Sequence, residues 1–316
     1  MASTPLTDEN MSSLLAMRDL APILTEHSYE LRAAGKAERS IDNRTYNVRL
    51  FTDWLAGLDD APEAVAEVTT AQVTRWLAER ADVDAAETLL TRYRHLRAFF
   101  RWAEREEIVA RSPLTNLREP RAETQPVPVL STDDLRRLFA TTRKDTSFLG
   151  RRDFAMLAFL ADTGVRVGEL VALEVEDLDF GKAGTAHVVG KFRRERTVAF
   201  GPKVGKALLA YLRERSRHRL AEDARLWIGQ RGPLRAAAVW QVVRARGEDA
   251  GIKNLHPHVM RHTFAHRFRS EGGEEGDLAQ LGGWRSPAML ARYGASAAAE
   301  RALEAHQRVD LLGDVL

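Results

Sequence analysis

The residues best suited to do chemistry lie towards the C-terminal end of the sequence, in the stretch from His258 to Phe264. His258 and Arg261 are three residues apart, which on a helix places both side chains on one face. A guanidinium fork matches phosphate oxygens, and an imidazole can accept a proton near neutral pH. Tyr293 follows in a second predicted helix and is a candidate nucleophile toward phosphorus. The combination indicates chemistry on a phosphodiester.

Arg166 is a second candidate, in the segment from Thr163 to Leu170. Gly164 permits a tight turn that lifts the following residues out of the path of the preceding helix. Glu169 lies one helical turn beyond Arg166, so it is placed to hold the guanidinium. The same pair also fits an ordinary surface ion pair, which is common at this spacing.

Lys191 follows Gly190 at the tip of a predicted β-hairpin. The runs 185–189 and 196–200 are rich in β-branched residues and flank a charged segment, a pattern typical of such a hairpin. A lysine there can reach into a site as a point charge or a proton donor. The alternative is a solvated turn, because several arginines lie beside it.

Four of the nine histidines lie within a short segment: His256, His258, His262 and His266. A metal site is the rival interpretation of this cluster. None of the usual zinc spacings is present, and the chain contains no cysteine. We therefore expect no metal and no cofactor, with His262 and His266 packed in the core or on the surface.

Trp284 and Tyr293 bracket the last candidate segment, which begins Leu281-Gly282-Gly283. The Trp284 indole N–H can donate one hydrogen bond. A tyrosine on a helix that ends at a glycine is ordinarily a packed aromatic with a satisfied hydroxyl. Tyr293 alone is therefore compatible with a structural role.

Helical periodicity dominates the N-terminal third of the chain. We expect residues 1–20 to form a loosely attached arm and residues 21–118 to form a small helical domain, with helices over 40–58, 70–80 and 87–107. One side of the last helix carries Arg92, Arg94, Arg97 and Arg101. Three prolines within residues 119–130 then break the helical pattern and predict an extended linker.

The second predicted domain spans residues 131–299, with a tail over 300–316. Ser131 and Asp134 have the spacing of a capping box at a helix start. Helices are expected over 152–160 and 167–173, then the hairpin, then helix as far as about residue 310. The fold class is mainly α with a small β-sheet.

The amino-acid composition says more about the cellular compartment of the protein than about its function. The 47 Lys and Arg residues nearly balance the 45 Asp and Glu residues, giving a net charge of +2. The absence of cysteine excludes disulfide frameworks and fits a reducing compartment. No signal peptide and no apolar run long enough to span a membrane is visible, so we expect no membrane partner and a cytoplasmic, nucleoid-associated protein.

The order of these motifs resembles the tyrosine recombinase (phage integrase) family, and its Xer-like members in particular. The motifs are Thr-Gly-x-Arg-x-x-Glu-Leu, a hairpin with Gly-Lys-x-x-x-Glu-Arg, His-x-x-Arg-His-Thr-Phe-Ala, and Leu-Gly-Gly-Trp-x-Ser followed by a tyrosine. The resemblance covers residues 131–300 and extends more faintly to the first domain, which resembles the family's core-binding (SAM-like) domain. It implies a catalytic domain with the DNA breaking–rejoining fold.

The resemblance also implies a role for each matching residue. Arg166 and Arg261 would clamp the scissile phosphate, Lys191 would protonate the leaving 5′ oxygen, and His258 would assist proton transfer from the nucleophile Tyr293. Glu169 would support Arg166. Trp284 stands where most members have a second histidine, so it is expected to position and pack rather than exchange protons.

A site-specific recombinase of this kind cuts and rejoins DNA through a 3′-phosphotyrosyl intermediate, in integration, excision or Xer-like resolution. The implied partners are double-stranded DNA with inverted half-sites, further copies of the chain in a tetramer, and an accessory recombinase or directionality factor. Arg92, Arg94 and Arg97 are candidate DNA contacts, with a solvated basic face as the alternative. A type IB topoisomerase and a catalytically silent DNA-binding protein are the alternative functions. The tail 300–316 docks either on its own domain or on a neighbouring subunit.

Overall fold

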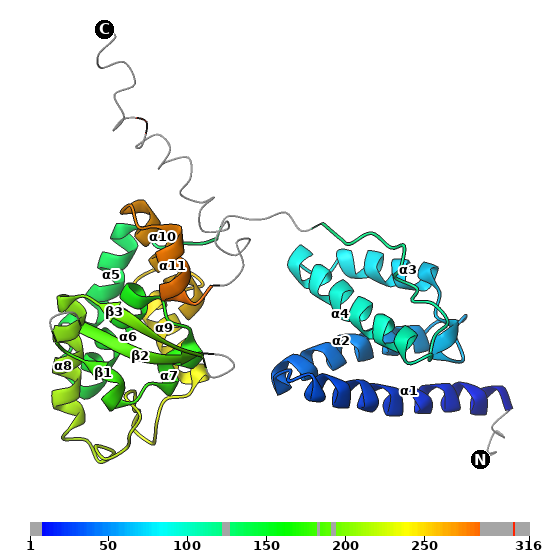
Figure 1. Ribbon diagram of the computed structural model, residues 1–316, viewed down its shortest axis with the longest axis horizontal. Coiled ribbons are helices and arrows are strands. Elements are labelled where there is room, and N and C mark those ends of the chain that lie inside the picture. Colours follow the sequence, from blue (N-terminus) through cyan, green and yellow to red (C-terminus); the bar gives the residue numbers. More distant parts are fainter. Residues whose placement is uncertain (1–7, 122–126, 182–183, 191–193, 285–305, 307–316) are drawn as a thin grey trace, which may run out of the picture. The chain divides into compact units, whose positions relative to one another are not determined.

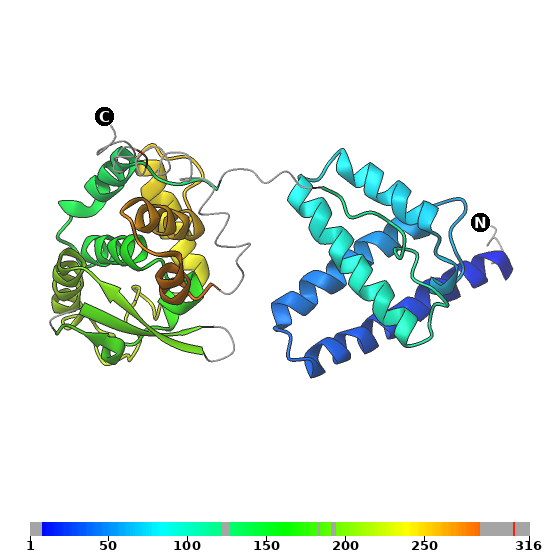
Figure 2. The same ribbon diagram turned by 45° about the horizontal axis from the view of Figure 1, so that its top comes forward.

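The computed structural model describes residues 8–121, 127–181, 184–190, 194–284 and residue 306, with side chains from Leu20 onward. The chain divides into two compact units, Met1–Thr124 and Gln125–Leu316. The division falls within the segment 119–130 that was expected to be a linker. Figures 1 and 2 draw the first unit in blue to blue-green and the second in green to orange.

The described part of the first unit is helical. Its elements are α1 (Asp8–Ala33), α2 (Glu38–Ala56), the 3₁₀ turn η1 (Val65–Glu67), α3 (Thr70–Ala81) and α4 (Ala86–Arg105). Helix α2 contacts each of the other three long helices, as Figures 1 and 2 show. The helices expected over 40–58, 70–80 and 87–107 are confirmed, and each end lies within two residues of its predicted position.

Helix α1 departs from the expectation of a loose arm. It begins at Asp8 and continues through Pro22, so the boundary expected at residue 20 falls inside a helix. Proline removes one backbone hydrogen bond and usually ends or kinks a helix. From Leu20 onward the apolar residues of α1 join the core, with Leu24 and Leu31 buried. This packing compensates for the proline.

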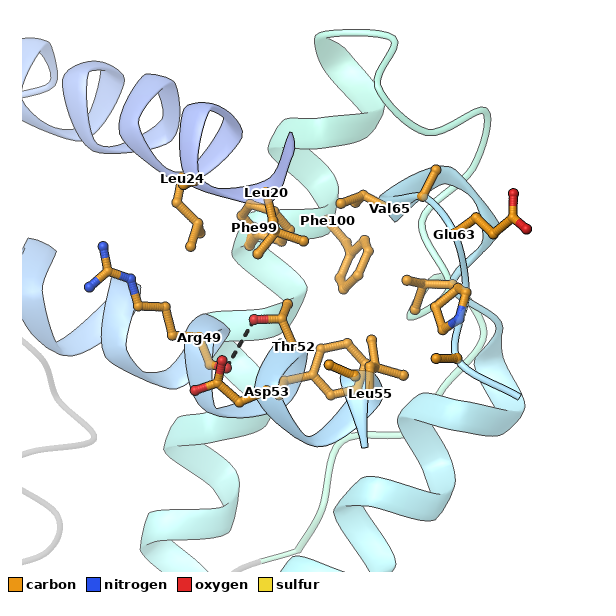
Figure 3. A pocket seen from close by; sticks show the side chains of 17 residues that line it. Leu20, Leu24, Arg49, Thr52, Asp53, Leu55, Glu63, Val65, Phe99 and Phe100 are labelled. Carbon is orange, nitrogen blue, oxygen red and sulfur yellow. Dashed lines mark hydrogen bonds between the residues drawn. The ribbon is translucent and has the colours of Figure 1, made fainter. Parts of the chain in front are cut away.

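Aromatic side chains form the centre of the first unit. Phe51 of α2 meets Trp76 of α3 edge to face at 5.2 Å between ring centroids, and Phe99 and Phe100 of α4 meet in the same way. Burying each such ring contributes roughly 1.5–3 kcal/mol to folding. An apolar cavity of about 260 Å³ lies between α1, α2 and the segment around Val65, with Phe100 on its wall (Figure 3).

The second unit combines helices with a small sheet. Its described elements are α5 (Thr132–Arg143), α6 (Phe148–Thr163), α7 (Val167–Ala172), η2 (Val175–Asp177), β1 (Leu178–Asp179), β2 (Gly184–Gly190), β3 (Arg194–Phe200), α8 (Pro202–Arg215), α9 (Ala236–Asp249), α10 (Pro257–Ser270) and α11 (Glu275–Gly282). In neither unit does a described helix have the length and apolar character needed to cross a membrane.

The sheet confirms the predicted hairpin strands and adds a third. Strands β2 and β3 are antiparallel, in a register that pairs Gly184 with Phe200 and Gly190 with Arg194. The short strand β1 lies on the other side of β2, giving the order β1-β2-β3. Residues 191–193, which connect β2 to β3, lie outside the described residues.

Helix α6 lies at the centre of the second unit and contacts α5, α8, α10 and β3 (Figure 1). Met156, Phe159 and Leu160 are fully buried on it. The helix is longer than the predicted 152–160, because Ser147 caps its start by accepting a hydrogen bond from the Gly150 N–H at 3.1 Å. The capping box predicted at Ser131 and Asp134 is present at the start of α5.

The segment 216–235 corrects the expectation of unbroken helix after the hairpin. It has no helix and instead turns back on itself, with Ile228 bridging to Pro233. Gly229 and Gly232, followed by proline, favour such a turn over a helix. The buried Arg215 side chain donates to four carbonyls in this segment, including that of Leu226, and satisfies them within the core.

Candidate active site at the C-terminal end of helix α11

The turn between α6 and α7 places Arg166. Gly164 ends α6 in the left-handed conformation, with φ of 59°, and Arg166 directly precedes the first residue of α7. A Cβ on Gly164 would lie 2.2 Å from Phe264, so glycine is required here by space as well as by φ. The tight turn predicted from the sequence is therefore confirmed.

Glu169 holds both the backbone and the side chain of Arg166. The Arg166 backbone N–H donates to one carboxylate oxygen at 2.8 Å, and its Nη1 donates to the other at 2.9 Å. Arg166 keeps 38% of its side chain exposed, whereas Glu169 keeps 3%. The predicted contact is present, and it is more than a surface ion pair because the carboxylate is buried.

Arg196 is a second partner of Glu169, and it was missed at the sequence level. Its two terminal nitrogens each donate to one oxygen of Glu169, both at 2.8 Å. Burial alone would raise the pKa of Glu169, but hydrogen bonds and charge from Arg196 and Arg166 lower it to about 2. The carboxylate is therefore ionised at any physiological pH.

A signal for Arg196 existed in the strand pattern. Along β3 the side chains of Val198 and Phe200 are buried and Arg196 is partly buried, while the residues between them are exposed. Arg196 thus stands in the inward phase of a two-residue alternation. An arginine in that phase needs a buried acidic partner, which is Glu169.

Helix α10 presents Arg261 to the same region. The side chain is 4% exposed. Its Nη1 donates to the Gly164 carbonyl, and its Nη2 donates to the Gly282 carbonyl at 2.6 Å. The guanidinium carbon lies 4.0 Å from the centroid of the buried Trp284 ring, a distance typical of a cation–π contact. Trp284 was expected to position and pack, and its buried ring lies against the Arg261 guanidinium.

Three arginines meet at the C-terminal end of α11. Arg196 donates to the carbonyl of Leu281, Arg261 to that of Gly282 and Arg166 to that of Gly283. The last carbonyls of a helix have no partner within it and carry the negative end of the helix dipole. The arginines satisfy these groups, and the arrangement concentrates positive charge directly before the segment that contains Tyr293.

His258 lies on α10 one turn before Arg261. Burial and the charges of Arg261 and Arg166 lower its pKa below the usual value, so the imidazole is neutral at pH 7. A neutral ring can accept a proton. Its neighbours are aromatic: His262 stacks at 6.4 Å between centroids and Trp240 meets it edge on at 6.2 Å.

The metal interpretation of the histidine cluster finds no support in the described part of the chain, where no three metal-binding side chains converge. His256 stacks on Trp240 at 4.9 Å, as a packed aromatic would. Two of the six catalytic candidates, Lys191 and Tyr293, lie outside the described residues. Gly190 ends β2 against Glu169, since a Cβ there would lie 3.1 Å from a carboxylate oxygen.

The first unit carries an arginine-lined groove of about 510 Å³. Its lining includes Arg44, Arg94, Arg97, Arg101 and Arg105 together with the buried His27. Arg94 and Arg97 contact Glu119 at 2.7 and 3.8 Å. Arg101 was placed with Arg94 and Arg97 on one side of the helix from the sequence, whereas Arg44 and Arg105 were not singled out.

The expected position of Arg92 on this basic face is wrong. Its side chain is 10% exposed, and it donates to Asp84 at 2.6 Å and to Asn47 at 2.9 Å. It therefore joins α4 to α2 and to the end of α3 inside the unit. Spacing along α4 alone did not separate the buried Arg92 from the exposed Arg94 and the partly exposed Arg97.

The model of the phage integrase family matches residues 128–300. A tyrosine recombinase XerC from Oceanobacillus iheyensis is 32% identical over 249 residues, which cover 76% of this chain and 80% of the relative. A tyrosine recombinase XerD from Ralstonia nicotianae is 29% identical over 245 residues, covering 76% and 78%.

Solved structures agree in fold. The XerH recombinase bound to palindromic difH substrate has a TM-score of 0.74 at 16% identity, covering 94% of this chain and 88% of that one. A lambda integrase dimer bound to a core site has a TM-score of 0.68 at 16% identity, covering 86% and 94%. None of these findings favours the topoisomerase alternative. The chain belongs to the phage integrase family and is an Xer-like, site-specific tyrosine recombinase.

Proposed function

We propose that Arg166, Lys191, His258, Arg261, Trp284 and Tyr293 form the DNA-cleavage site of this recombinase, with Glu169 in support. The observation that carries the proposal is the meeting of Arg166, which directly precedes α7, and Arg261 of α10 at the Gly283 and Gly282 carbonyls. Two guanidinium groups held in this way supply fixed donors where negative charge develops on a phosphate during attack.

The reaction proceeds by two transesterifications. The Tyr293 oxygen attacks the scissile phosphorus, and its proton passes to the neutral imidazole of His258. The bond from phosphorus to the 5′ oxygen breaks, and Lys191 gives that oxygen a proton. The 3′-phosphotyrosyl bond conserves the energy of the phosphodiester. A 5′ hydroxyl of the partner strand then attacks the phosphorus and gives its proton to Lys191, while the released Tyr293 oxygen takes its proton back from His258. No nucleotide cofactor is consumed.

The substrate in this proposal is double-stranded DNA with inverted half-sites. The arginine-lined groove of the first unit, with Arg94, Arg97 and Arg101, is the proposed surface for DNA phosphates, because guanidinium groups contact phosphates in pairs of hydrogen bonds. The first unit would be the core-binding domain and the second the catalytic domain. Their division between Thr124 and Gln125 supports residues 119–130 as the connecting segment.

The proposal also covers the assembly and the biological role of the recombinase. Four copies would join two duplexes, with the segment 300–316 docking on a neighbouring subunit, and the reaction would serve integration and excision of a mobile element or Xer-like resolution. An accessory recombinase or directionality factor would set the outcome, in the cytoplasm at the nucleoid. Deleting residues 300–316 should leave single-site DNA binding intact while synapsis and strand exchange are lost.

Covalent trapping tests the cleavage site. A suicide DNA site, nicked so that the released strand diffuses away, should capture the wild-type chain as a covalent adduct, also in EDTA. Tyr293→Phe should bind the same DNA with unchanged affinity and give no adduct. Tyr211→Phe is the matched control, since the Tyr211 hydroxyl donates to the buried Leu226 carbonyl. Its adduct should persist, and wild-type adduct from Tyr293→Phe would refute the assignment.

A further inference from the structure

Arg196 is the point where three parts of the proposed site are joined. Its two terminal nitrogens donate to both oxygens of Glu169, and its Nε donates to the Leu281 carbonyl at 2.8 Å. These contacts use every nitrogen of the guanidinium group. The side chain is 13% exposed, so the contacts are largely removed from water.

Together with Arg196 itself, these contacts join three segments of the chain. Arg196 itself is on β3, the strand that leaves the hairpin whose tip holds Lys191. Glu169 is on α7 and holds Arg166, and Leu281 is in the last turn of α11, which leads to Trp284. Among the hydrogen bonds between described residues, those of Arg196 join the hairpin both to Glu169 and to the end of α11.

The hairpin is also fixed close to its tip. Arg196 pairs with Val188 in the register of β2 and β3, and Gly190, the residue before Lys191, lies against Glu169. A Glu169 oxygen would be 3.1 Å from a Cβ at Gly190, so the end of β2 lies close to the carboxylate. Glu169 is thus hydrogen-bonded to Arg166 and Arg196 and lies beside the backbone of Gly190.

We propose that Arg196 is a positioning residue for cleavage, which sets the hairpin carrying Lys191 relative to Arg166 and to the C-terminal end of α11. It touches no reacting atom. Its effect passes through Glu169 to the phosphate clamp and through β3 to the proton donor. The proposal rests on the proposed function, because it takes Lys191 as the proton donor to the leaving 5′ oxygen.

The chemistry of the leaving group supplies a test that general destabilisation would not imitate. When sulfur replaces the 5′-bridging oxygen of the DNA site, the cleaved strand leaves as a thiolate and needs no proton. A variant with a misplaced Lys191 should therefore lose more cleavage on the oxygen substrate than on the sulfur substrate. A variant that merely lowers the folded fraction should lose the same factor on both.

The experiment measures single-turnover cleavage of both substrates by full-length wild type and by Arg196→Gln, Arg196→Lys, Lys191→Ala and Arg217→Ala. Arg217→Ala is the matched control, because the pair of Arg217 with Glu214 is an exposed arginine–glutamate pair at the end of α8. DNA affinity and the melting temperature are recorded for each. Arg196→Lys keeps the charge beside Glu169 but cannot make all three contacts.

Arg196→Gln should cleave the oxygen substrate about 10- to 100-fold more slowly, as expected for removal of a residue that orients catalytic groups, with DNA affinity within about threefold of wild type. On the sulfur substrate, the loss in cleavage rate of Arg196→Gln relative to wild type should be smaller by a factor of at least about five. Arg196→Lys should lie in between and Arg217→Ala should match wild type. If Arg196→Gln does not fold, Arg196→Lys carries the comparison.

Equal losses on the two substrates, or wild-type cleavage of the oxygen substrate, would overturn the role of Arg196. Lys191→Ala separates this failure from failure of the proposed function. When sulfur rescues Lys191→Ala but not the Arg196 variants, the assignment of Lys191 stands and that of Arg196 is refuted. Absence of rescue in Lys191→Ala would refute the proposed acid, and with it the inference built upon it.

Discussion

The guanidinium group of Arg261 lies on the face of the Trp284 ring, 4.0 Å from its centroid. Gly282, two residues before the tryptophan, makes the contact possible, because a Cβ there would come within 1.9 Å of the indole. The same guanidinium donates to the Gly282 carbonyl. An arginine proposed to hold a phosphate is thus fixed from one side by an aromatic face and from another by the end of a helix.

Replacing Trp284 should show how far the position of Arg261 depends on the face of the indole ring. Trp284→Ala should lower the free energy of unfolding of the second unit by roughly 3–5 kcal/mol, as for other large buried aromatics. Trp284→Phe keeps an apolar ring with a weaker cation–π attraction, so single-turnover cleavage should fall by only about tenfold. Chemical denaturation and covalent trapping give the two quantities. Equal cleavage by the alanine variant and wild type would show that Arg261 needs no aromatic support.

Two glycines near Arg166 should respond oppositely to alanine. Gly164→Ala forces a side chain into the left-handed region and against Phe264, so the second unit should lose about 3 kcal/mol of stability. It should also slow cleavage, because the Gly164 carbonyl accepts from Arg261. Gly168→Ala, in α7 with no atom within 4 Å of the new Cβ, should be neutral or stabilising by up to about 1 kcal/mol. Melting curves decide between these outcomes, and a Gly164→Ala variant as stable as wild type would contradict the strain.

The sequence was sufficient for the local features of this site. Gly164, Arg166 and Glu169 lie within six residues, so a turn followed by a helical contact could be predicted from spacing alone. The hairpin strands followed from alternation in the same way. His258 and Arg261 were correctly placed on one helix, because helical spacing is also a local property.

What the sequence could not give depends on tertiary contacts. The meeting of Arg166, Arg196 and Arg261 at α11 joins segments far apart in the chain, and no local period encodes it. Arg92 was misassigned for the same reason, because its partner Asn47 lies on another helix. The continuation of α1 past Pro22 depends likewise on packing against α2, which local propensity does not reveal.

His27 should make the first unit sensitive to mild acid. Burial, followed by the charge of Arg44, lowers its pKa from 6.5 to about 4. Between these values the unfolded chain binds a proton that the folded chain excludes, so stability falls as the pH drops from about 6.5 to 4. The loss of unfolding free energy is on the order of 3 kcal/mol, since one pKa unit corresponds to about 1.4 kcal/mol.

A variant isolates this effect from other titrating groups. His27→Leu keeps an apolar side chain against Phe99 and Trp102 and removes the proton site. Hydrogen exchange of α1 and α4 should then show a smaller loss of protection between pH 6.5 and 4.5 in the variant than in wild type. Identical pH dependence in the two proteins would mean that His27 accepts its proton without cost in the folded state.

Arg92 and Arg97, on the same helix, should separate stability from DNA binding. Arg97→Ala should lower the slope of log affinity against log salt by about one, because one phosphate contact is lost, and it should change stability by less than about 1 kcal/mol. Arg92→Ala removes one of the two arginine partners of the buried Asp84 and the hydrogen bond from Arg92 to Asn47. The free energy of unfolding of this variant should therefore fall by about 3–5 kcal/mol. Its salt slope, measured at low temperature on folded protein by fluorescence anisotropy, should equal that of wild type. A lowered slope in Arg92→Ala with unchanged slope and affinity in Arg97→Ala would reverse the two assignments.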